Sequence, residues 1–229
     1  MTDTEPPPLD DLDALVKGAD PDRWLTTRFI ADADRRADVL ALYAFDAELA
    51  RAPRVASNPL VGEIRLTWWA EAVAEIFEDR AVRRHPVAEA LAAAVKRHGL
   101  RREALDELVE ARMVELDKRP LTEAEAVVWS DAVGAGMMAL AARVLEADAV
   151  IPTEMGRAFG LCRAVVAGLV PHETVRTVMA AAVTAARAAP ALSVAAFPAV
   201  MPLVIAQAPA EGDLVKRARL VWASLRGRV

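Results

Sequence analysis

Helical patterns run along almost the whole of this 229-residue chain, and no segment shows the apolar–polar alternation of a half-buried strand. Helix start signals are frequent. Ser57-Asn58-Pro59 places a capping residue before a proline at the first helical position, and Thr122 to Glu125 has the capping-box pattern. The signals predict about nine helices, over residues 32–51, 59–78, 86–99, 101–118, 122–145 and 152–169, from Pro171 onward, and over 193–207 and 213–225.

We therefore expect an all-α, single-domain helical bundle spanning residues 11–229, with short connections between helices. The acidic, proline-rich residues 1–10 are expected to form a short disordered tail. That stretch lacks an apolar h-region, so it does not resemble a signal peptide. Pro53 is expected to end the helix that begins at Asp32.

Composition narrows the class of protein. Hydrophobic residues make up 55% and charged residues 27% of the chain, a balance typical of a folded soluble protein. The net charge of −5 gives no basic face for nucleic acid. A single cysteine, Cys162, excludes an internal disulfide and suits a reducing compartment. We expect a cytoplasmic protein.

Residues 188–210 carry no charge and are long enough to cross a bilayer. Four prolines interrupt the segment, and each would free backbone groups that are costly to expose in lipid. We interpret it as a buried core helix flanked by proline breaks. A peripheral contact with the inner membrane remains the alternative.

Four short motifs, in order, carry a family resemblance. Tyr43-Ala-Phe45 is followed at suitable spacing by Asn58-Pro-Leu-Val-Gly-Glu-Ile-Arg-Leu-Thr-Trp-Trp69, a helix with Leu60, Ile64, Trp68 and Ala72 on one stripe. Further on come Trp129 to Met138, with two glycines, and the helix from Gly156 to Gly168. Together they resemble bacterial members of the squalene/phytoene synthase family over about residues 20–210. Taken alone, each motif is equally explained by helix packing.

The resemblance implies an isoprenoid-synthase-like bundle around a central apolar channel. In such synthases two acidic clusters hold Mg²⁺ and a diphosphate. Aligned on Tyr43, the first pair of metal-binding positions holds Ala50 and Arg54, and the second cluster is replaced by Gly160, Arg163 and Ala167. Mg²⁺ requires oxygen ligands, which none of these side chains supplies. We therefore predict no catalytic residue, no metal site and no cofactor.

The remaining carboxylates leave one alternative open. Asp46 and Glu48 lie two residues apart and so do not share a helical face, and Glu115 falls near an aspartate position of the family. An active prenyl transferase using such displaced acidic residues, with Mg²⁺, is the competing hypothesis. His85, His98 and His172 show no metal-ligand spacing, and Cys162 has no histidine near it in sequence.

Ala44-Phe45-Asp-Ala-Glu48-Leu49-Ala50 matches a branch of the family that includes an assembly factor for respiratory complex I. The resemblance implies a non-catalytic assembly or scaffold protein, with respiratory-complex subunits as partners and an isoprenoid or phospholipid as ligand. Arg54 and Arg163 would give the channel a cationic mouth suited to a phosphate head group. A purely structural subunit with a filled core is the third hypothesis. The cavity-lining candidates are Tyr43, Phe45, Arg54, Arg65, Trp68, Trp69, Gly134, Met137, Phe159 and Arg163.

Overall fold

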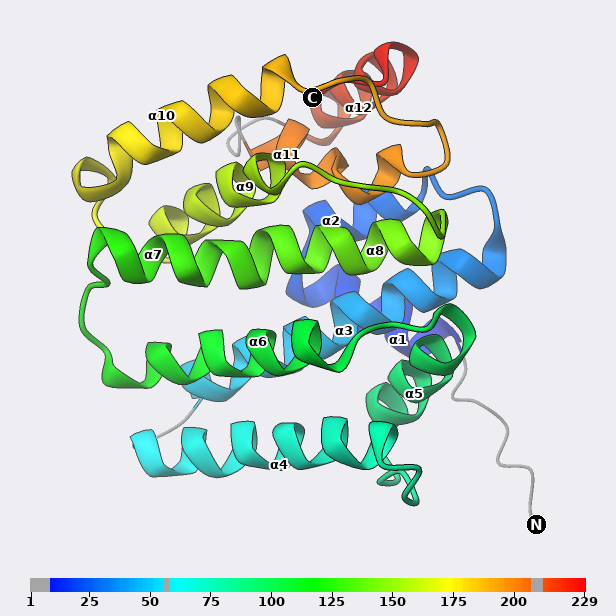
Figure 1. Ribbon diagram of the computed structural model, residues 1–229, viewed down its shortest axis with the longest axis vertical. Helices are drawn as coiled ribbons and strands as arrows, with labels where there is room; N and C mark the ends of the chain where they lie inside the picture. Colours follow the sequence, from blue (N-terminus) through cyan, green and yellow to red (C-terminus); the bar gives the residue numbers. More distant parts are fainter. Residues whose placement is uncertain (1–8, 56–57, 207–211) are drawn as a thin grey trace. The chain divides into compact units, whose positions relative to one another are not determined.

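The structure is a computed structural model that describes residues 9–55, 58–206 and 212–229, and these residues are helical without any strand (Figure 1). The all-α class is confirmed. Contacts between Cα atoms group the chain into two compact units, Met1–Leu116 and Asp117–Val229. Most of the tail expected at residues 1–10 lies outside the described residues, and α1 already begins at Leu9.

The first unit is built around one long helix, α3. It contains α1 (Leu9–Ala19), α2 (Pro21–Thr27), α3 (Ala33–Val55), α4 (Pro59–Phe77), α5 (Pro86–His98), α6 (Arg102–Met113) and most of the 3-10 turn η1 (Val114–Asp117). The helix α3 contacts α1, α2, α4, α5 and α6, and most of its side chains between residues 38 and 53 are buried. Residues on α3 are therefore held from several sides.

Local chemistry sets the helix ends in this unit. The Asn58 side chain accepts a hydrogen bond from the Val61 amide at 3.0 Å, so α4 begins at Pro59 as predicted. Gly99 ends α5 in the left-handed conformation, at φ 58°. The prediction that Pro53 ends α3 is wrong, because the helix continues to Val55. A proline this close to a helix end removes one backbone hydrogen bond without breaking a long run of them.

The second unit consists of α7 (Glu123–Ser130), the π-helical segment η2 (Asp131–Gly136), α8 (Met137–Leu145), α9 (Thr153–Val166), α10 (His172–Ala188), the 3-10 turn η3 (Phe197–Ala199), α11 (Met201–Ala206) and α12 (Asp213–Arg226). Residues Glu123–Leu145 form one continuous helix through η2. Its apolar stretch is long enough to span a membrane, but 61% of that stretch is buried within the protein, as in an ordinary core helix.

Glycines allow α9 to touch both α7 and η2 backbone to backbone. A Cβ atom on Gly134 would lie 2.0 Å from the carbonyl oxygen of Gly156, and one on Gly160 would lie 2.7 Å from Ser130. These separations are shorter than any van der Waals contact, so a side chain at either position would force the helices apart. Helix packing therefore accounts for Gly134.

The single helix predicted over residues 193–207 is wrong. The chain forms a loop, then η3 and α11, and residue 207 lies outside the described residues. Pro198 and Pro202 each lie at the start of a short helical segment, where a helix tolerates proline best. The predicted burial is confirmed for residues 196–203, which include Phe197, Met201 and Leu203, whereas residues 188–195 are mostly exposed, with Val194 at 88%.

Candidate functional site

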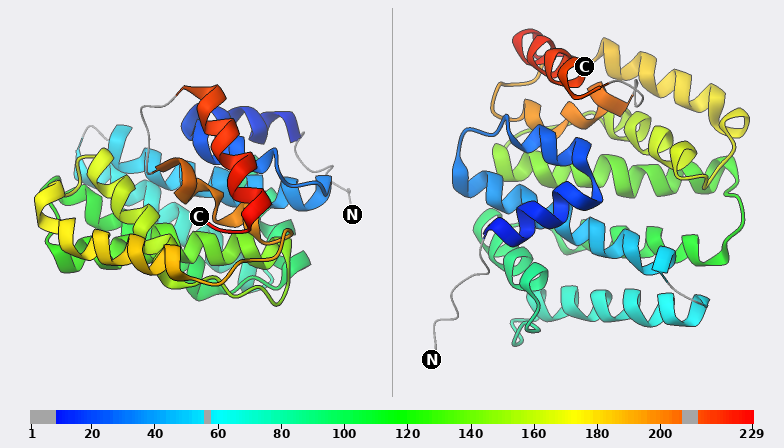
Figure 2. Two further views of the ribbon diagram at one scale, coloured as in Figure 1. Left: turned by 90° about the horizontal axis from the view of Figure 1, so that it is seen from above. Right: turned by 180° about the vertical axis from the view of Figure 1, so that it is seen from behind.

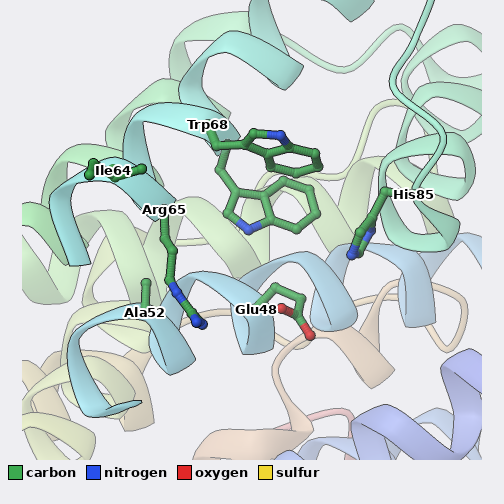
Figure 3. A pocket seen from close by; sticks show the side chains of 7 residues that line it. Glu48, Ala52, Ile64, Arg65, Trp68 and His85 are labelled. Atoms are coloured by element: carbon green, nitrogen blue, oxygen red, sulfur yellow. The ribbon is translucent and has the colours of Figure 1, made fainter. Parts of the chain in front are cut away.

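Two pockets lie beside α3 in the first unit, and Glu48 lines both. The first has a volume of about 270 Å³ and is formed by α3, α4 and the start of α5, with Glu48, Ala52, Ile64, Arg65, Trp68, Trp69 and His85 along its wall (Figure 3). The second has a volume of about 300 Å³ and lies between α1 and the C-terminal half of α3. Its wall is made by Leu15, Ala19, Ala47, Glu48, Arg51, Arg54 and Val55.

Aromatic rings form the inner wall of the first pocket. Trp69 is only 5% exposed and meets Trp68 edge to face, with ring centroids 4.8 Å apart. Phe45 lies behind Trp69 at 5.4 Å, and the His85 ring lies 5.1 Å from Trp69. Trp69 is thus the buried member of the pair, and Trp68 is half-buried. The pocket therefore offers apolar ring surface to a ligand.

His85 is placed by the start of α5. Its Nδ1 accepts a hydrogen bond from the Val87 amide at 3.3 Å, so the imidazole serves as the N-terminal cap of that helix. Because this cap requires Nδ1 to be unprotonated, the remaining ring nitrogen, Nε2, carries the proton in the neutral ring. His85 thus presents a ring face and one donor at the pocket.

The polar groups of the first pocket are few. Figure 3 shows Arg65 reaching from α4 toward α3, where Glu48 and Ala52 lie. Glu48 pairs with Arg51 on its own helix at 3.7 Å. A pocket near the lower end of the usual ligand-site range of about 300–1,000 Å³, with one cation and one carboxylate, suits a small apolar or aromatic group that ends in a polar atom.

The helix α3 also carries a buried ion-pair network centred on Asp46. The Asp46 side chain is 4% exposed; one of its oxygens accepts a hydrogen bond from Arg23 of α2 at 2.5 Å, and the other accepts one from Arg112 of α6 at 2.6 Å. Arg112 also donates to Glu115 at 2.7 Å. Two guanidinium groups are thus neutralised by carboxylates inside the unit.

The surroundings of the network shift its pKa values. Burial alone would lower the pKa of Arg112, but attraction to Asp46 and Glu115 outweighs burial and raises that pKa above its usual value. Burial raises the pKa of Tyr43 to about 12, although the nearby Arg23 guanidinium, 5.2 Å from the ring, acts in the opposite direction. The arginines therefore stay charged and the tyrosine stays neutral over the physiological pH range.

Sequence reasoning missed both arginines of this network, which lie 23 and 66 residues from Asp46 along the chain. A signal was present for Arg112. It follows Leu105 and Leu108 at spacings of seven and four residues, which places it on the buried face of α6. A charged residue on such a face needs a partner of opposite charge.

Six residues of the first unit were predicted to line a cavity. The structure places them in or behind the first pocket, in the second pocket, or beside the ion-pair network. Arg65, Trp68 and Trp69 line the first pocket with Phe45 behind them, Arg54 lines the second, and Tyr43 lies beside Arg23. Ala50, at the first of the aligned metal positions, is buried in α3 and offers no oxygen, whereas Arg54 is exposed.

The four candidates in the second unit lie on η2, α8 and α9. Gly134 contacts the backbone of Gly156, Met137 and Phe159 are buried, and the Arg163 guanidinium lies 5.8 Å from the Phe159 ring centre. A cavity shared by these residues and those of the first unit stays a prediction. Across the described parts of the chain, no three His, Cys, Asp or Glu side chains come together in a way that could hold a metal ion.

Comparison with known proteins identifies the class. The sequence model of the squalene/phytoene synthase family matches residues 16–167, well over half of the chain, and the chain belongs to this family. Among curated proteins, the chain is similar to NADH dehydrogenase (ubiquinone) complex I, assembly factor 6. The Homo sapiens protein is 33% identical over 105 residues, and the Bos taurus protein is 30% identical over 105 residues.

The similarity to assembly factor 6 is distant and partial. In both cases the matched region covers 46% of this chain and 31% of the relative, so the chain matches less than a third of the length of these proteins.

Proposed function

We propose that this chain is a non-catalytic member of the squalene/phytoene synthase family that acts as an assembly or scaffold factor for a respiratory complex of the complex I type. The observation that carries the non-catalytic part is the state of the carboxylates on α3. Both oxygens of Asp46 are engaged by arginines, and the aligned metal positions hold Ala50 and Arg54.

Coupling of prenyl diphosphates requires loss of diphosphate, and Mg²⁺ carries the charge that develops in that step. A Mg²⁺ ion needs several free oxygen ligands in near-octahedral geometry. On α3, Glu48 is the carboxylate that lines the pockets, and it is paired with Arg51. One paired carboxylate is too few to hold the metal and a diphosphate.

The assembly role rests on the similarity to assembly factor 6 of complex I, which covers part of each chain. A scaffold of this kind needs a stable fold and a binding surface rather than a reactive centre. The ion-pair network of Asp46 serves the first need, because it ties α2, α3 and α6 together inside one unit.

In this proposal the second pocket is the ligand-binding site. Arg51 and Arg54 lie there beside the apolar side chains of Leu15, Ala47 and Val55. Such a site suits an amphiphile with a phosphate head group, such as an isoprenoid phosphate or a phospholipid. The position of Arg54 in the last turn of α3 has a second explanation, because cations there are favoured by the helix dipole.

The non-catalytic part is tested by incubating the protein with farnesyl or geranylgeranyl diphosphate and Mg²⁺ and measuring released diphosphate. The expected result is release at the background rate. Mg²⁺-dependent turnover that disappears in Glu48→Gln but survives in Glu63→Gln, an exposed carboxylate on α4, would establish the transferase hypothesis instead.

The assembly part is tested in membranes from a strain that lacks the gene. The expected result is a loss of NADH–quinone oxidoreductase activity and of assembled complex I, with succinate oxidation unchanged as the matched control. Complementation by the wild-type gene should restore the complex. Normal levels of assembled complex I in the deletion strain would refute the role.

The ligand part is tested by thermal shift with a prenyl phosphate and with the corresponding prenyl alcohol. Stabilisation by the phosphate alone, lost in Arg54→Gln and kept in Arg35→Gln, is the expected result. Equal behaviour of the two variants would leave Arg54 as a helix-end cation and remove the phosphate site from the proposal.

A further inference from the structure

The C-terminal helix α12 (Asp213–Arg226) exposes an apolar face to solvent. Leu214 is 83% exposed and Leu225 is 77% exposed, and the same face carries the exposed side chains of Val215, Val221 and Trp222. Large apolar side chains gathered on one exposed face mark an interaction site more often than single ones do.

This exposure is not the result of a loosely attached helix. Leu220 and Ala223 are buried, and α12 packs on α11, as Figure 2 shows with α12 in red and α11 in orange. Gly227 ends the helix in the left-handed conformation, and its carbonyl accepts a hydrogen bond from the Leu192 amide at 3.0 Å. Since each residue turns the helix by roughly 100°, Leu214 and Leu225 lie on the side away from Leu220.

The charges on α12 are as uneven as its apolar residues. Residues 212–229 carry five cationic side chains against a single carboxylate, Asp213, so their net charge is +4 in a chain whose net charge is −5. The cations are Lys216, Arg217, Arg219, Arg226 and Arg228.

The arginines lie at the borders of the apolar face. At about 100° per residue, Arg217 falls on one edge of that face, and Arg219 and Arg226 fall on the other. The Arg226 guanidinium lies 4.3 Å from the centre of the Trp222 ring. A helix with an apolar face that includes tryptophan, bordered on both sides by arginine, is typical of helices that lie in the plane of a membrane surface.

We propose that α12 binds the surface of an anionic lipid membrane. The apolar face enters the boundary between head groups and acyl chains, and the bordering arginines remain at the level of the lipid phosphates. The charge of +4 favours a negatively charged surface, which an apolar protein groove would not require. The packed face of Leu220 and Ala223 keeps the rest of the unit on the aqueous side. This inference does not depend on the assembly role.

The test is co-flotation of the whole protein with vesicles. Phosphatidylcholine vesicles with roughly one third phosphatidylglycerol are compared with phosphatidylcholine alone. Wild-type protein is expected to float with the anionic vesicles, to be released as the salt concentration rises, and to stay in solution with the neutral ones.

Two variants and a matched control locate the contact. Leu225→Glu is expected to weaken binding at least about tenfold, and Arg217→Gln roughly fivefold. Val166→Glu adds the same charge at a valine on α9 that is 72% exposed, and it should bind as the wild type does. All three positions are exposed, so circular dichroism and melting should be unchanged.

Absence of wild-type binding to anionic vesicles would overturn the proposal, as would an equal loss in Val166→Glu. If the wild-type protein is a dimer by light scattering, binds no vesicle, and becomes a monomer in Leu225→Glu, the face of α12 is a contact between copies of the chain instead. Each of these outcomes leaves the deletion-strain and diphosphate-release experiments unaffected.

Discussion

Replacement of Asp46 by asparagine should be among the most destabilising isosteric changes in the first unit. The carboxylate accepts hydrogen bonds from Arg23 and Arg112, which are themselves buried. Asparagine keeps the volume of the side chain but removes its charge and turns one of its two acceptor atoms into a donor. That amide would then face a guanidinium group, which also only donates.

The magnitude follows from what each arginine retains. Breaking a buried ion pair by removing one partner costs about 3–5 kcal/mol, because the other charge stays buried without compensation. Arg112 keeps Glu115 at 2.7 Å, and Arg23 keeps Asp20 at 3.9 Å. The remaining pairs soften the loss, so we expect the free energy of unfolding to fall by about 3 kcal/mol, the lower end of that range.

Asp38→Asn on the same helix is the matched control. Asp38 is also buried, but it pairs with Arg97, whose side chain is 53% exposed, and with His98. When the carboxylate is lost, Arg97 can turn back into water, so the expected cost is about 1–2 kcal/mol. Urea denaturation followed by circular dichroism gives both free energies of unfolding, provided that the dependence on urea concentration (the m-value) is the same in the variants and the wild type. If Asp46→Asn lies within about 1 kcal/mol of the wild type, or is milder than Asp38→Asn, the network does not stabilise the unit.

The fold class could be predicted because it depends on local chemistry. The caps at Asn58 and Thr122 fix the starts of α4 and α7 through hydrogen bonds that span three residues, so the sequence contains all that is needed. The breaks over residues 193–207 were not predictable in the same way. Pro198 and Pro202 are compatible with either a kinked helix or separate short turns. The structure has separate turns, and in this arrangement Phe197 and Leu203 are buried within the second unit.

The face of α4 shows the limit of periodicity. The stripe from Leu60 through Ile64 predicts a helix correctly, but both side chains are exposed. The buried side of α4 is formed by Leu66, Trp69 and Val73, which have an equally good helical spacing. Two apolar stripes on one helix cannot be ranked without knowing what packs against each.

The site was predictable in its aromatic part and not in its ionic part. The adjacent Trp68 and Trp69 point in different directions on a helix, so one of them had to face the interior. The pairing of Asp46 with Arg23 and Arg112 depends instead on how α2, α3 and α6 meet, and no short-range pattern encodes that.

Three further predictions follow from burial and close contacts. Tyr43 is the single tyrosine, so absorbance at 295 nm follows its ionisation alone. In the folded protein its pKa should be about 12 instead of about 10. The raised pKa should contribute about 2–3 kcal/mol to the free energy of unfolding below pH 10, and this contribution should be lost as the pH rises toward 12. A midpoint near 10 before unfolding would contradict its burial. Trp69→Ala should lower the free energy of unfolding by about 3–5 kcal/mol, and Trp68→Ala should lower it clearly less, because Trp68 is only half-buried. A lower melting temperature for Trp68→Ala than for Trp69→Ala would show that Trp68 is the core residue instead. Gly134→Ala should cost at least about 2 kcal/mol, because its Cβ would lie 2.0 Å from a backbone oxygen of α9 that no side-chain rotation can move. Gly136→Ala, two residues away, meets its nearest atom at 3.5 Å and should be neutral or stabilising by up to about 1 kcal/mol, since alanine loses less chain entropy on folding. Equal melting temperatures for the two variants would show that the contact between η2 and α9 is not as close as the structure has it.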